Sequence, residues 1–273
     1  MTINCNGKLI DLSTPKVMGI LNLTPDSFYD GGKYKSDLDI LNQVEKMLND
    51  GGTFIDIGSY SSRPNAEHVS EDEELKRLLP NIEIILKKFP KTLISVDTFR
   101  GNVATESINL GACMVNDISG GTLDDNMYKT IGKLQVPYVL MHLKGTPQNM
   151  QQNPTYENVV RDVLKYFSEK VALLRKEKVN DIILDVGFGF AKTLEHNYTL
   201  LKNLEHFKIL ELPILTGVSR KSMLYKPLNT DAKNALNATT VANTIALQKG
   251  ASILRVHDVK EAMEAIKVVA EIQ

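Results

Sequence analysis

The sequence has few cysteines, almost no net charge and no long apolar run, and each shortage argues against a class of protein. Cys5 and Cys113 lie far apart and form no CxxC motif, so neither a disulfide framework nor a zinc site is indicated, and a reducing compartment fits. The 32 lysines and arginines nearly cancel the 33 aspartates and glutamates, without a basic stripe or an acidic tail. Nucleic acid and anionic membranes are therefore poor candidates for the main partner.

No apolar run approaches the roughly 18 residues that a membrane span needs. The start of the chain has neither the basic residues nor the apolar core of a signal peptide. The 273 residues, 42% of them hydrophobic, are enough for one large core, and no linker, low-complexity tract or internal repeat divides them. We expect a single domain over residues 1–273 of a cytoplasmic protein.

Short apolar runs recur along the chain and predict strands. They are continuous rather than alternating, which is typical of strands buried on both faces of a parallel sheet. The runs occupy residues 16–21, 53–58, 93–97, 112–117, 138–142, 182–186, 214–218 and 252–257. Helical patterns between them cover residues 37–52, 71–89, 154–178, 232–250 and 259–273, with shorter candidates after the third, fourth and sixth runs.

Strand and helix alternate eight times, which indicates an α/β protein with a TIM (β/α)8 barrel. The first residues, INCNGKLIDL (3–12), have Asn6 and Gly7 at their centre and predict an N-terminal β-hairpin that plugs the end where the strands start. A doubly wound open sheet is the competing architecture, but it usually has fewer strands.

In such barrels the chemistry takes place where the strands end. The polar residues at the predicted strand ends are Asn22, Asp97, Asn116, Asp117, His142, Asp185, Arg255 and His257. Asp97 could equally cap the helix that starts near Arg100 or bind a ligand. One of Asn116 and Asp117 could satisfy a turn while the other faces the pocket.

Acid and amide groups that converge on one mouth could recognise the edge of a heterocycle. Asp185 is one of these acids. The segment GFGF (187–190) comes just after it and is a poor match to a dinucleotide-binding motif. Gly187 and Gly189 more plausibly let backbone approach a flat ligand closely.

Cationic residues near the last two strand ends predict an anion pocket. The segment TGVSRKSML (216–224) places Lys221 and Ser222 where barrels often bind phosphate, although a solvated basic turn or a Schiff-base lysine are alternatives. Arg255 and His257, on alternate positions, could meet a phosphate together, with Arg63 as a third contact.

The remaining polar residues in this part of the sequence have simpler explanations. Asp258, three residues before Glu261, is interpreted as the start of a capping box for the last helix. His68, His196 and His206 are expected at the surface, and His142 is left as a supporting residue.

The motifs together resemble the dihydropteroate synthase family, whose fold is a TIM barrel. The matching blocks are GILNLTPDSFYDGG (19–32), DIGSYSSRP (56–64), SVDTFR (95–100), VNDISGG (115–121), MHLKGTPQNMQ (141–151), DVGFGFAKTLEHN (185–197), GVSRKSML (217–224) and RVHDV (255–259). The resemblance implies condensation of 6-hydroxymethyl-7,8-dihydropterin pyrophosphate with p-aminobenzoate, giving 7,8-dihydropteroate and pyrophosphate. It also implies Mg²⁺, a homodimer and inhibition by sulfonamides.

The resemblance carries roles to residues of this chain. Asp97, Asn116, Asp185, Lys221 and Arg255 would bind the pterin. Asn22, Arg63, Arg255 and His257 would hold the pyrophosphate, with Asn22 also on the metal. Ser62, Pro64, Gly189, Phe190, Lys221 and Ser222 would line the p-aminobenzoate side. Asp97, Lys221, Arg255 and His257 would be the catalytic set, and LTPDSFYDGG would be the family's mobile first loop.

The second loop departs from the family pattern DxGGESTRP. Ser59 and Tyr60 replace Gly and Glu, Ser62 replaces Thr, and Tyr29 in the first loop stands where a small residue is commoner. Tyr60 keeps open a non-catalytic pterin-binding paralogue. A methyltetrahydrofolate methyltransferase needs no pyrophosphate pocket, and an aldolase that uses Lys221 is a more distant alternative.

Overall fold

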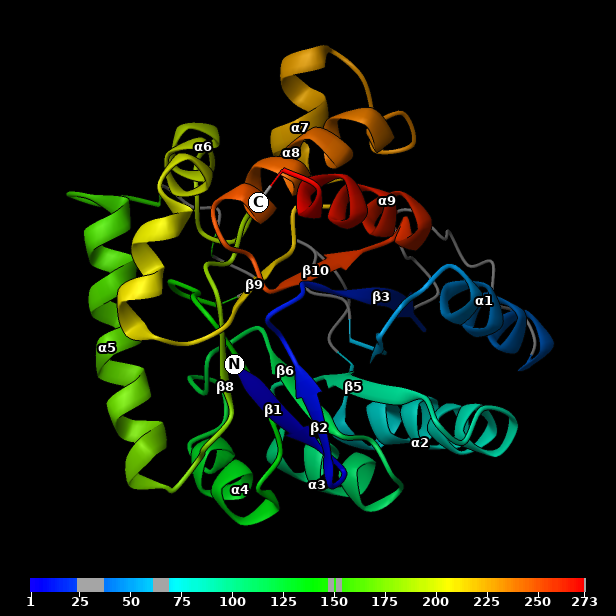
Figure 1. The fold of residues 1–273 in the computed structure, drawn as a ribbon. Helices are drawn as coiled ribbons and strands as arrows, with labels where there is room; N and C mark the ends of the chain where they lie inside the picture. Colours follow the sequence, from blue (N-terminus) through cyan, green and yellow to red (C-terminus); the bar gives the residue numbers. More distant parts are fainter. Residues whose placement is uncertain (24–36, 61–68, 147–149, 151–153, 273) are drawn as a thin grey trace.

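Parallel strands close into a barrel, and helices form its outer ring (Figure 1). The structure is a computed structural model and describes residues 1–23, 37–60, 69–146, 150 and 154–272. Around the barrel the strand order is β10-β3-β4-β5-β6-β7-β8-β9. The barrel strands are β3 Lys16–Asn22, β4 Phe54–Gly58, β5 Leu93–Asp97, β6 Met114–Asp117, β7 Tyr138–Met141, β8 Ile182–Asp185, β9 Ile214–Thr216 and β10 Ile253–Val256. Each predicted run overlaps one of these strands, and the barrel is closed, so the predicted TIM barrel is confirmed and the open sheet is wrong.

The helices follow the strands, as the sequence predicts, but α5 and α8 begin later than expected and three short elements are added. They are α1 Asp37–Asn49, α2 Glu71–Lys88, α3 Gly101–Asn109, α4 Met127–Leu134, α5 Val159–Lys176, α6 Leu194–Lys202, α7 Ser222–Tyr225, α8 Leu236–Gln248 and α9 Val259–Ala270, with 3-10 helices η1 Leu204–Leu210 and η2 Lys226–Leu228. Helix α5 begins later than expected because the side chain of Asn158 caps it, accepting a hydrogen bond from the Arg161 amide at 3.0 Å. The short elements α7, η1 and η2 were not predicted, because one or two turns show too little periodicity.

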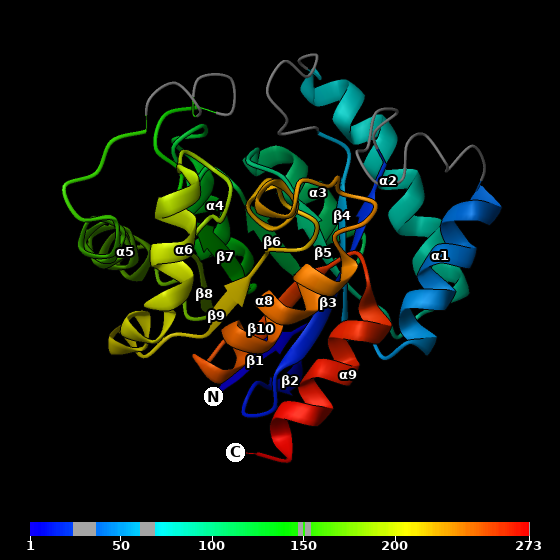
Figure 2. The same cartoon turned by 90° about the horizontal axis from the view of Figure 1, so that it is seen from above.

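An antiparallel hairpin closes the end of the barrel where the strands begin, which we call the lower end. It pairs β1 Thr2–Cys5 with β2 Lys8–Asp11 through a turn at Asn6 and Gly7, both with positive φ. The amide of Asn4 donates to Asp181 at 2.8 Å, and the Asn6 side chain donates to the Gly111 carbonyl at 2.9 Å. The predicted plug is therefore confirmed. Figure 2 shows both chain ends on this side and the opposite end, the mouth, above.

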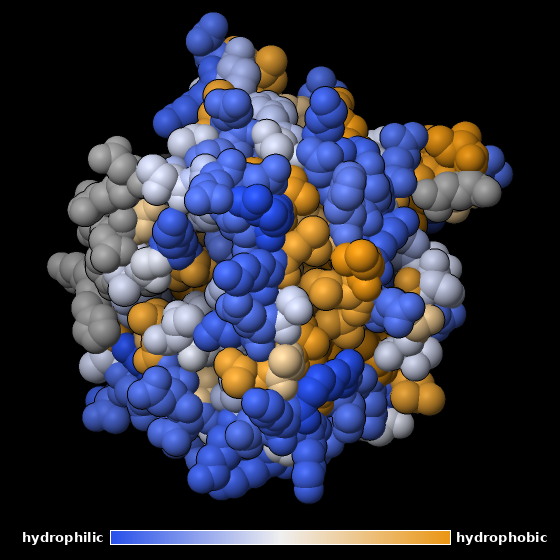
Figure 3. All heavy atoms as spheres, turned by 90° about the vertical axis from the view of Figure 1, so that its left-hand side faces the viewer, coloured by the Kyte–Doolittle hydropathy of each residue, from blue (hydrophilic) through white to orange (hydrophobic). Residues whose placement is uncertain are grey.

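Two apolar regions hold the barrel together. One lies between the strands and the surrounding helices. The other fills the lower interior, where Ile3 and Ile10 of the hairpin pack with Met18, Phe54 and Ile253 of the barrel. Figure 3 shows that the side covered by α5 and α6 is mostly hydrophilic, as expected of helices that bury their apolar face. A hydrophobic strip lies near the middle of this side. Within the described residues no helix is long and apolar enough to cross a membrane.

Helix α4 approaches the end of α5 through a glycine. A Cβ added at Gly132 would lie 2.1 Å from the carbonyl oxygen of Glu177, a backbone atom that cannot rotate away. Gly132→Ala should therefore lower the free energy of unfolding by about 2 kcal/mol, since overpacking outweighs the helix propensity of alanine. Urea titration measures this, with the exposed Lys133→Ala on the same helix as the control. A Gly132→Ala protein at least as stable as the wild type would contradict the close packing.

Candidate active site

The inward-facing residues of the barrel change from apolar to polar toward the mouth. Phe54 and Met114 face inward in the lower interior. Because alternate residues of a strand face the same side, the residues two positions further along these strands and their partners in register also face inward, closer to the mouth. These upper positions include Asp56 and Gly58 of β4, Ser95 and Asp97 of β5, Asn116 of β6, Asp185 of β8 and Arg255 of β10. Strands far apart in sequence thus bring acids, an amide and a guanidinium together in the upper interior of the barrel, and we call this group of residues the polar layer.

Arg255 lies between two carboxylates of this layer. Its Nε donates to Asp56 Oδ2 at 2.6 Å and its Nη2 donates to Asp97 Oδ2 at 2.8 Å. Burial acts to lower the pKa of Arg255, but Asp56 and Asp97 raise it above the ordinary value, so the guanidinium stays charged. The arrangement fixes a planar cation at the floor of the mouth.

Asp97 faces the pocket and caps no helix. The residue at the start of α3 is Arg100, and it makes no side-chain cap, so the capping alternative for Asp97 is wrong. Burial raises the pKa of Asp97 to about 7, with Arg255 opposing and Asp56 adding to the shift. The carboxyl group is therefore poised to change charge near neutral pH.

Asn116 and Asp117 divide their roles as the sequence suggests. Asp117 accepts from the amides of Ser119 and Gly121 at 2.7 and 2.8 Å, and from the hydroxyl of Tyr138 at 2.6 Å. Its carboxylate thus satisfies the turn after β6. Asn116 is the inward residue and donates from Nδ2 to Asp56 at 3.0 Å.

Asp185 and Lys221 form the other side of the layer. Asp185 accepts from the Gly187 amide at 2.8 Å, while Lys221 Nζ donates to the Phe188 carbonyl and lies 4.6 Å from the centre of the Phe190 ring. Burial lowers the pKa of Lys221 to about 8, opposed by Asp185, so the ammonium form prevails at pH 7. That charge state suits an anion or a ring face better than a Schiff base.

The glycines after β8 permit close backbone contacts. A Cβ on Gly187 would lie 2.3 Å from the His142 carbonyl oxygen, and one on Gly189 would lie 3.3 Å from Lys221 Cδ. Both glycines have positive φ, 70° and 80°. Phe190 and Lys221 lie together in this part of the mouth.

His257 is held by Ser219 just beyond the end of β10. The Ser219 hydroxyl lies 3.0 Å from His257 Nδ1 and accepts from the His257 amide at 3.2 Å. Burial, followed by the charge of Arg255, lowers the pKa of His257 to about 4. At neutral pH the imidazole is therefore a hydrogen-bonding group and not the cation considered from the sequence.

This low pKa predicts a pH-dependent stability. The unfolded chain takes up a proton at His257 near pH 6.5 and the folded chain only near 4, so the contribution is full above 6.5 and is lost as pH falls toward 4. His257→Gln should flatten the fall in unfolding free energy by up to about 1.4 kcal/mol per pH unit. Urea titrations across this window, with the exposed His206→Gln as control, measure the difference. Equal slopes in wild type and His257→Gln would refute it.

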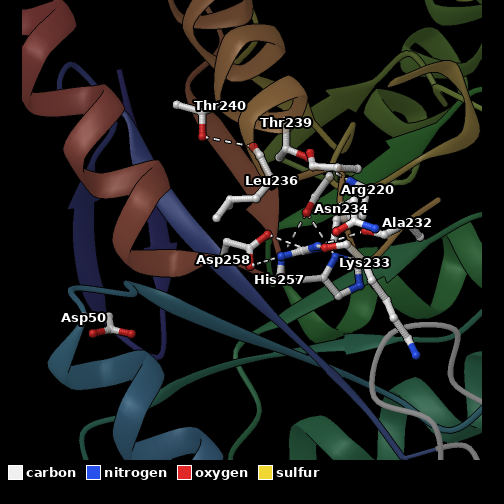
Figure 4. Close-up of polar contacts among 12 residues, drawn as sticks. Asp50, Arg220, Ala232, Lys233, Asn234, Leu236, Thr239, Thr240, His257 and Asp258 are labelled. Atoms are coloured by element: carbon white, nitrogen blue, oxygen red, sulfur yellow. Dashed lines mark hydrogen bonds and ion pairs between the residues drawn. The ribbon is translucent and has the colours of Figure 1, made fainter. Parts of the chain in front are cut away.

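Asp258 forms an ion pair with Arg220 rather than a capping box (Figure 4). It stands at the start of α9 but makes no side-chain cap, so the predicted box with Glu261 is wrong. Arg220 Nε and Nη2 each donate to its carboxylate at 2.8 Å, and Nη1 donates to the carbonyls of Ala232 and Lys233. Arg220 thus fixes the segment that carries Lys221. Its guanidinium charge is balanced by the bidentate ion pair with Asp258.

Two site residues were missed by reasoning from the sequence. Asp56 stands in the middle of a strand, and an acid inside an apolar run was the available signal. Lys192 is buried, and its Nζ lies 2.9 Å from His142 Nδ1 and from the Phe190 carbonyl. Burial lowers the pKa of Lys192 to about 7. Burial also lowers the pKa of His142 well below its usual range, and the positive charge of Lys192 adds to this shift. His142 thus supports the loop that carries Phe190.

Other predicted residues lie at the edge of the site or outside the described part of the chain. Asn22 ends β3 opposite Gly58, half-buried at the mouth, and Ser222 opens α7. Several predicted residues lie outside the described part of the chain: Ser62, Arg63, Pro64, His68, Tyr29 and most of the first loop. Of the other two histidines expected at the surface, His206 is exposed and His196 is half-buried against the Tyr156 ring.

Tyr60 packs beside the mouth. Its ring meets Phe99 edge-on at 4.9 Å between centroids, and the Arg100 guanidinium lies 5.5 Å from its centre. The aromatic ring thus has its own partners where the family pattern has a carboxylate.

Fold and site together define a (β/α)8 barrel whose mouth is lined by acids, an amide and cations. Residues 18–257 match the family described as Pterin binding enzyme. The chain is 45% identical over 270 residues to the dihydropteroate synthase of Haemophilus influenzae and 43% identical over 274 residues to that of Escherichia coli K12, with 98% of this chain covered in both and 98% and 95% of those proteins. The chain belongs to the dihydropteroate synthase family.

Solved structures agree with this assignment. The Yersinia pestis dihydropteroate synthase in a sulfonamide drug complex is 41% identical and superposes with a TM-score of 0.96, covering 100% of this chain and 99% of that one. The Xanthomonas albilineans enzyme in complex with 7,8-dihydropteroate is 31% identical, with a TM-score of 0.88 over 100% and 99% of the two chains.

Proposed function

We propose that this chain condenses 6-hydroxymethyl-7,8-dihydropterin pyrophosphate with p-aminobenzoate to give 7,8-dihydropteroate and pyrophosphate. The observation that carries the proposal is the polar layer in which Arg255 lies between Asp56 and Asp97, beside Asn116, Asp185 and Lys221. Carboxylates and an amide match the alternating donors and acceptors of a pterin edge, and a fixed guanidinium and ammonium suit its anionic substituent.

In this proposal the side chains divide the binding of the two substrates, and Asp97, Lys221 and Arg255 each take part in more than one contact. Asp97, Asn116 and Asp185 bind the pterin edge, Lys221 contacts the ring, and Arg255 stacks on it. Arg255 and His257 hold the pyrophosphate with Arg63 and Asn22. The outer residues Ser62, Pro64, Gly189, Phe190, Lys221 and Ser222 receive p-aminobenzoate.

The proposed reaction is dissociative. The bond between the pterin methylene carbon and the pyrophosphate oxygen breaks first, and the leaving pyrophosphate takes the electron pair. Arg255 stabilises its charge, while neutral His257 contributes a hydrogen bond. Asp97, in its ionised form, steadies the cationic methylene. The neutral amine of p-aminobenzoate then forms the carbon–nitrogen bond and loses a proton to solvent.

We propose Mg²⁺ as the metal. Mg²⁺ is usually held by one or two protein oxygens together with substrate phosphates, and the amide oxygen of Asn22 at the mouth fits such a site. Among the described residues no group of three His, Cys, Asp or Glu side chains could hold a metal on its own. When bound, Mg²⁺ would neutralise charge on the pyrophosphate.

We further propose a cytoplasmic homodimer. Both cysteines are free and buried, which fits a reducing compartment. Neighbouring surfaces of α6, η2 and α8 expose the apolar side chains of Leu194, Tyr198, Leu228 and Val241, which a second copy could cover. Sedimentation velocity tests the oligomeric state, and a single species with the mass of one chain would contradict the dimer.

Pyrophosphate release tests the proposed function. Wild-type protein with dihydropterin pyrophosphate and Mg²⁺ should release pyrophosphate only when p-aminobenzoate is present. Lys221→Ala should lose this turnover, whereas Lys226→Ala, which removes an exposed lysine of η2, should retain it. Pterin binding without turnover in the wild type would instead favour the second candidate, a non-catalytic pterin-binding paralogue, which the replacement at Tyr60 keeps open.

A further inference from the structure

Asp56 is a buried acid that no step of the proposed reaction uses. Its side chain is 1% exposed, in the middle of β4. Its Oδ1 accepts from the Ser95 hydroxyl at 2.6 Å, and its Oδ2 accepts from both Asn116 Nδ2 at 3.0 Å and Arg255 Nε at 2.6 Å. Asp56 therefore contacts two of the residues proposed to bind the pterin, from below.

The chemistry of these contacts determines how Asn116 is oriented. An amide side chain can donate from its nitrogen or accept at its oxygen, and rotation by half a turn exchanges the two. An ionised carboxylate that already receives Arg255 can only accept, so it requires the nitrogen of Asn116 to face it. The Asn116 oxygen is then turned away from Asp56.

We propose that Asp56 is a positioning residue that fixes Asn116 as a hydrogen-bond acceptor toward the ligand, so that the pocket selects a heterocycle edge with an N–H donor at that place. The inference rests on the proposed function, because it concerns how the same pocket recognises the pterin. Asp56 also holds Arg255 through Nε, which leaves Nη2 to reach Asp97.

The coupling between Asp56 and Asn116 is measurable with a double-mutant cycle. Binding of 6-hydroxymethyl-7,8-dihydropterin is followed by isothermal titration calorimetry under anaerobic conditions. Asp56→Ala and Asn116→Ala should each weaken binding by about ten- to a hundredfold. The double variant should bind no more than about threefold worse than Asp56→Ala, because the amide has already lost its orientation.

A second variant pair predicts a reversal of sign. Asn116→Asp places two carboxylates together in the wild-type background and should weaken binding at least about tenfold. In the Asp56→Ala background the same change supplies an acceptor that cannot flip, so it should strengthen binding relative to Asp56→Ala alone. A residue that merely supported the fold would give no such reversal.

Controls separate these effects from loss of structure. Glu74→Ala removes another buried carboxylate paired with an arginine, Arg100, and should lower the unfolding temperature without changing pterin affinity. Asp56→Asn keeps an oxygen for Asn116 and should recover part of the affinity. Independent effects of Asp56→Ala and Asn116→Ala would overturn the inference. Failure of the wild-type protein to bind the pterin would contradict the proposed function itself, and with it the inference.

Discussion

Arg255→Ala is expected to lower kcat/KM by about a thousandfold or more, because it removes the cation nearest the leaving pyrophosphate. It also leaves Asp56 and Asp97 facing each other without the charge that separates them. Breaking a buried pair by removing one partner costs about 3–5 kcal/mol in typical cases, so the variant should also unfold more easily. Both effects follow from one side chain that serves two carboxylates.

Arg255→Lys distinguishes charge from geometry. Lysine keeps a positive charge but cannot donate in the fork that reaches Asp56 and Asp97 at once. It should recover part of the stability and little of the turnover. Steady-state kinetics and thermal unfolding of both variants give the comparison. If Arg255→Ala keeps wild-type turnover, the guanidinium is not part of the machinery.

Asp97→Asn is expected to lower kcat by about a hundredfold while changing pterin pyrophosphate binding far less, because the side chain keeps its shape and loses only its charge. In the proposed reaction, the ionised carboxylate would face the carbon on which positive charge develops. A defect confined to binding, seen as a raised KM with normal kcat, would exclude this role.

The pH profile supplies a second readout for Asp97. Its raised pKa of about 7 means that the group ionises as pH rises through neutrality. If the ionised form is the active one, kcat/KM of the wild type should increase over this range, and the increase should vanish in Asp97→Asn. Because Arg255 opposes the shift, Arg255→Lys should keep the inflection while Arg255→Ala should move it to higher pH.

The fold was predictable because its signals are periodic and repeated. The strands are mostly apolar runs, and a polar residue stands at or directly after the carboxyl end of each, so the mouth of the barrel could be identified from the sequence. Asp97, Asn116, Asp185 and Arg255 were all found in this way, because parallel register carries strand ends to one place.

The remaining features depend on tertiary partners that no local pattern reveals. Asp258 looked like a capping residue because only its neighbours in sequence were visible, whereas its partner, Arg220, lies on another element. Asp56 lies inside a strand and not at its end, so the search of strand ends did not select it. Burial also shifts the pKa of His257 and of Lys192. The tertiary packing that buries these side chains cannot be deduced from the spacing of residues in the sequence.

In the described part of the chain, the hairpin closes the lower end of the barrel, so a ligand of the proposed site would enter from the mouth. Four of the residues proposed for the pterin, Asp97, Asn116, Asp185 and Arg255, lie within the strands, whereas Gly189, Phe190 and Ser222 lie in segments beyond the strand ends, nearer the rim. Under the proposed assignment, the deeper ligand would enter before the shallower one, and the products would leave by the same route. A compound that occupies only the rim would then retain a ligand bound below it and keep an empty pterin pocket from filling.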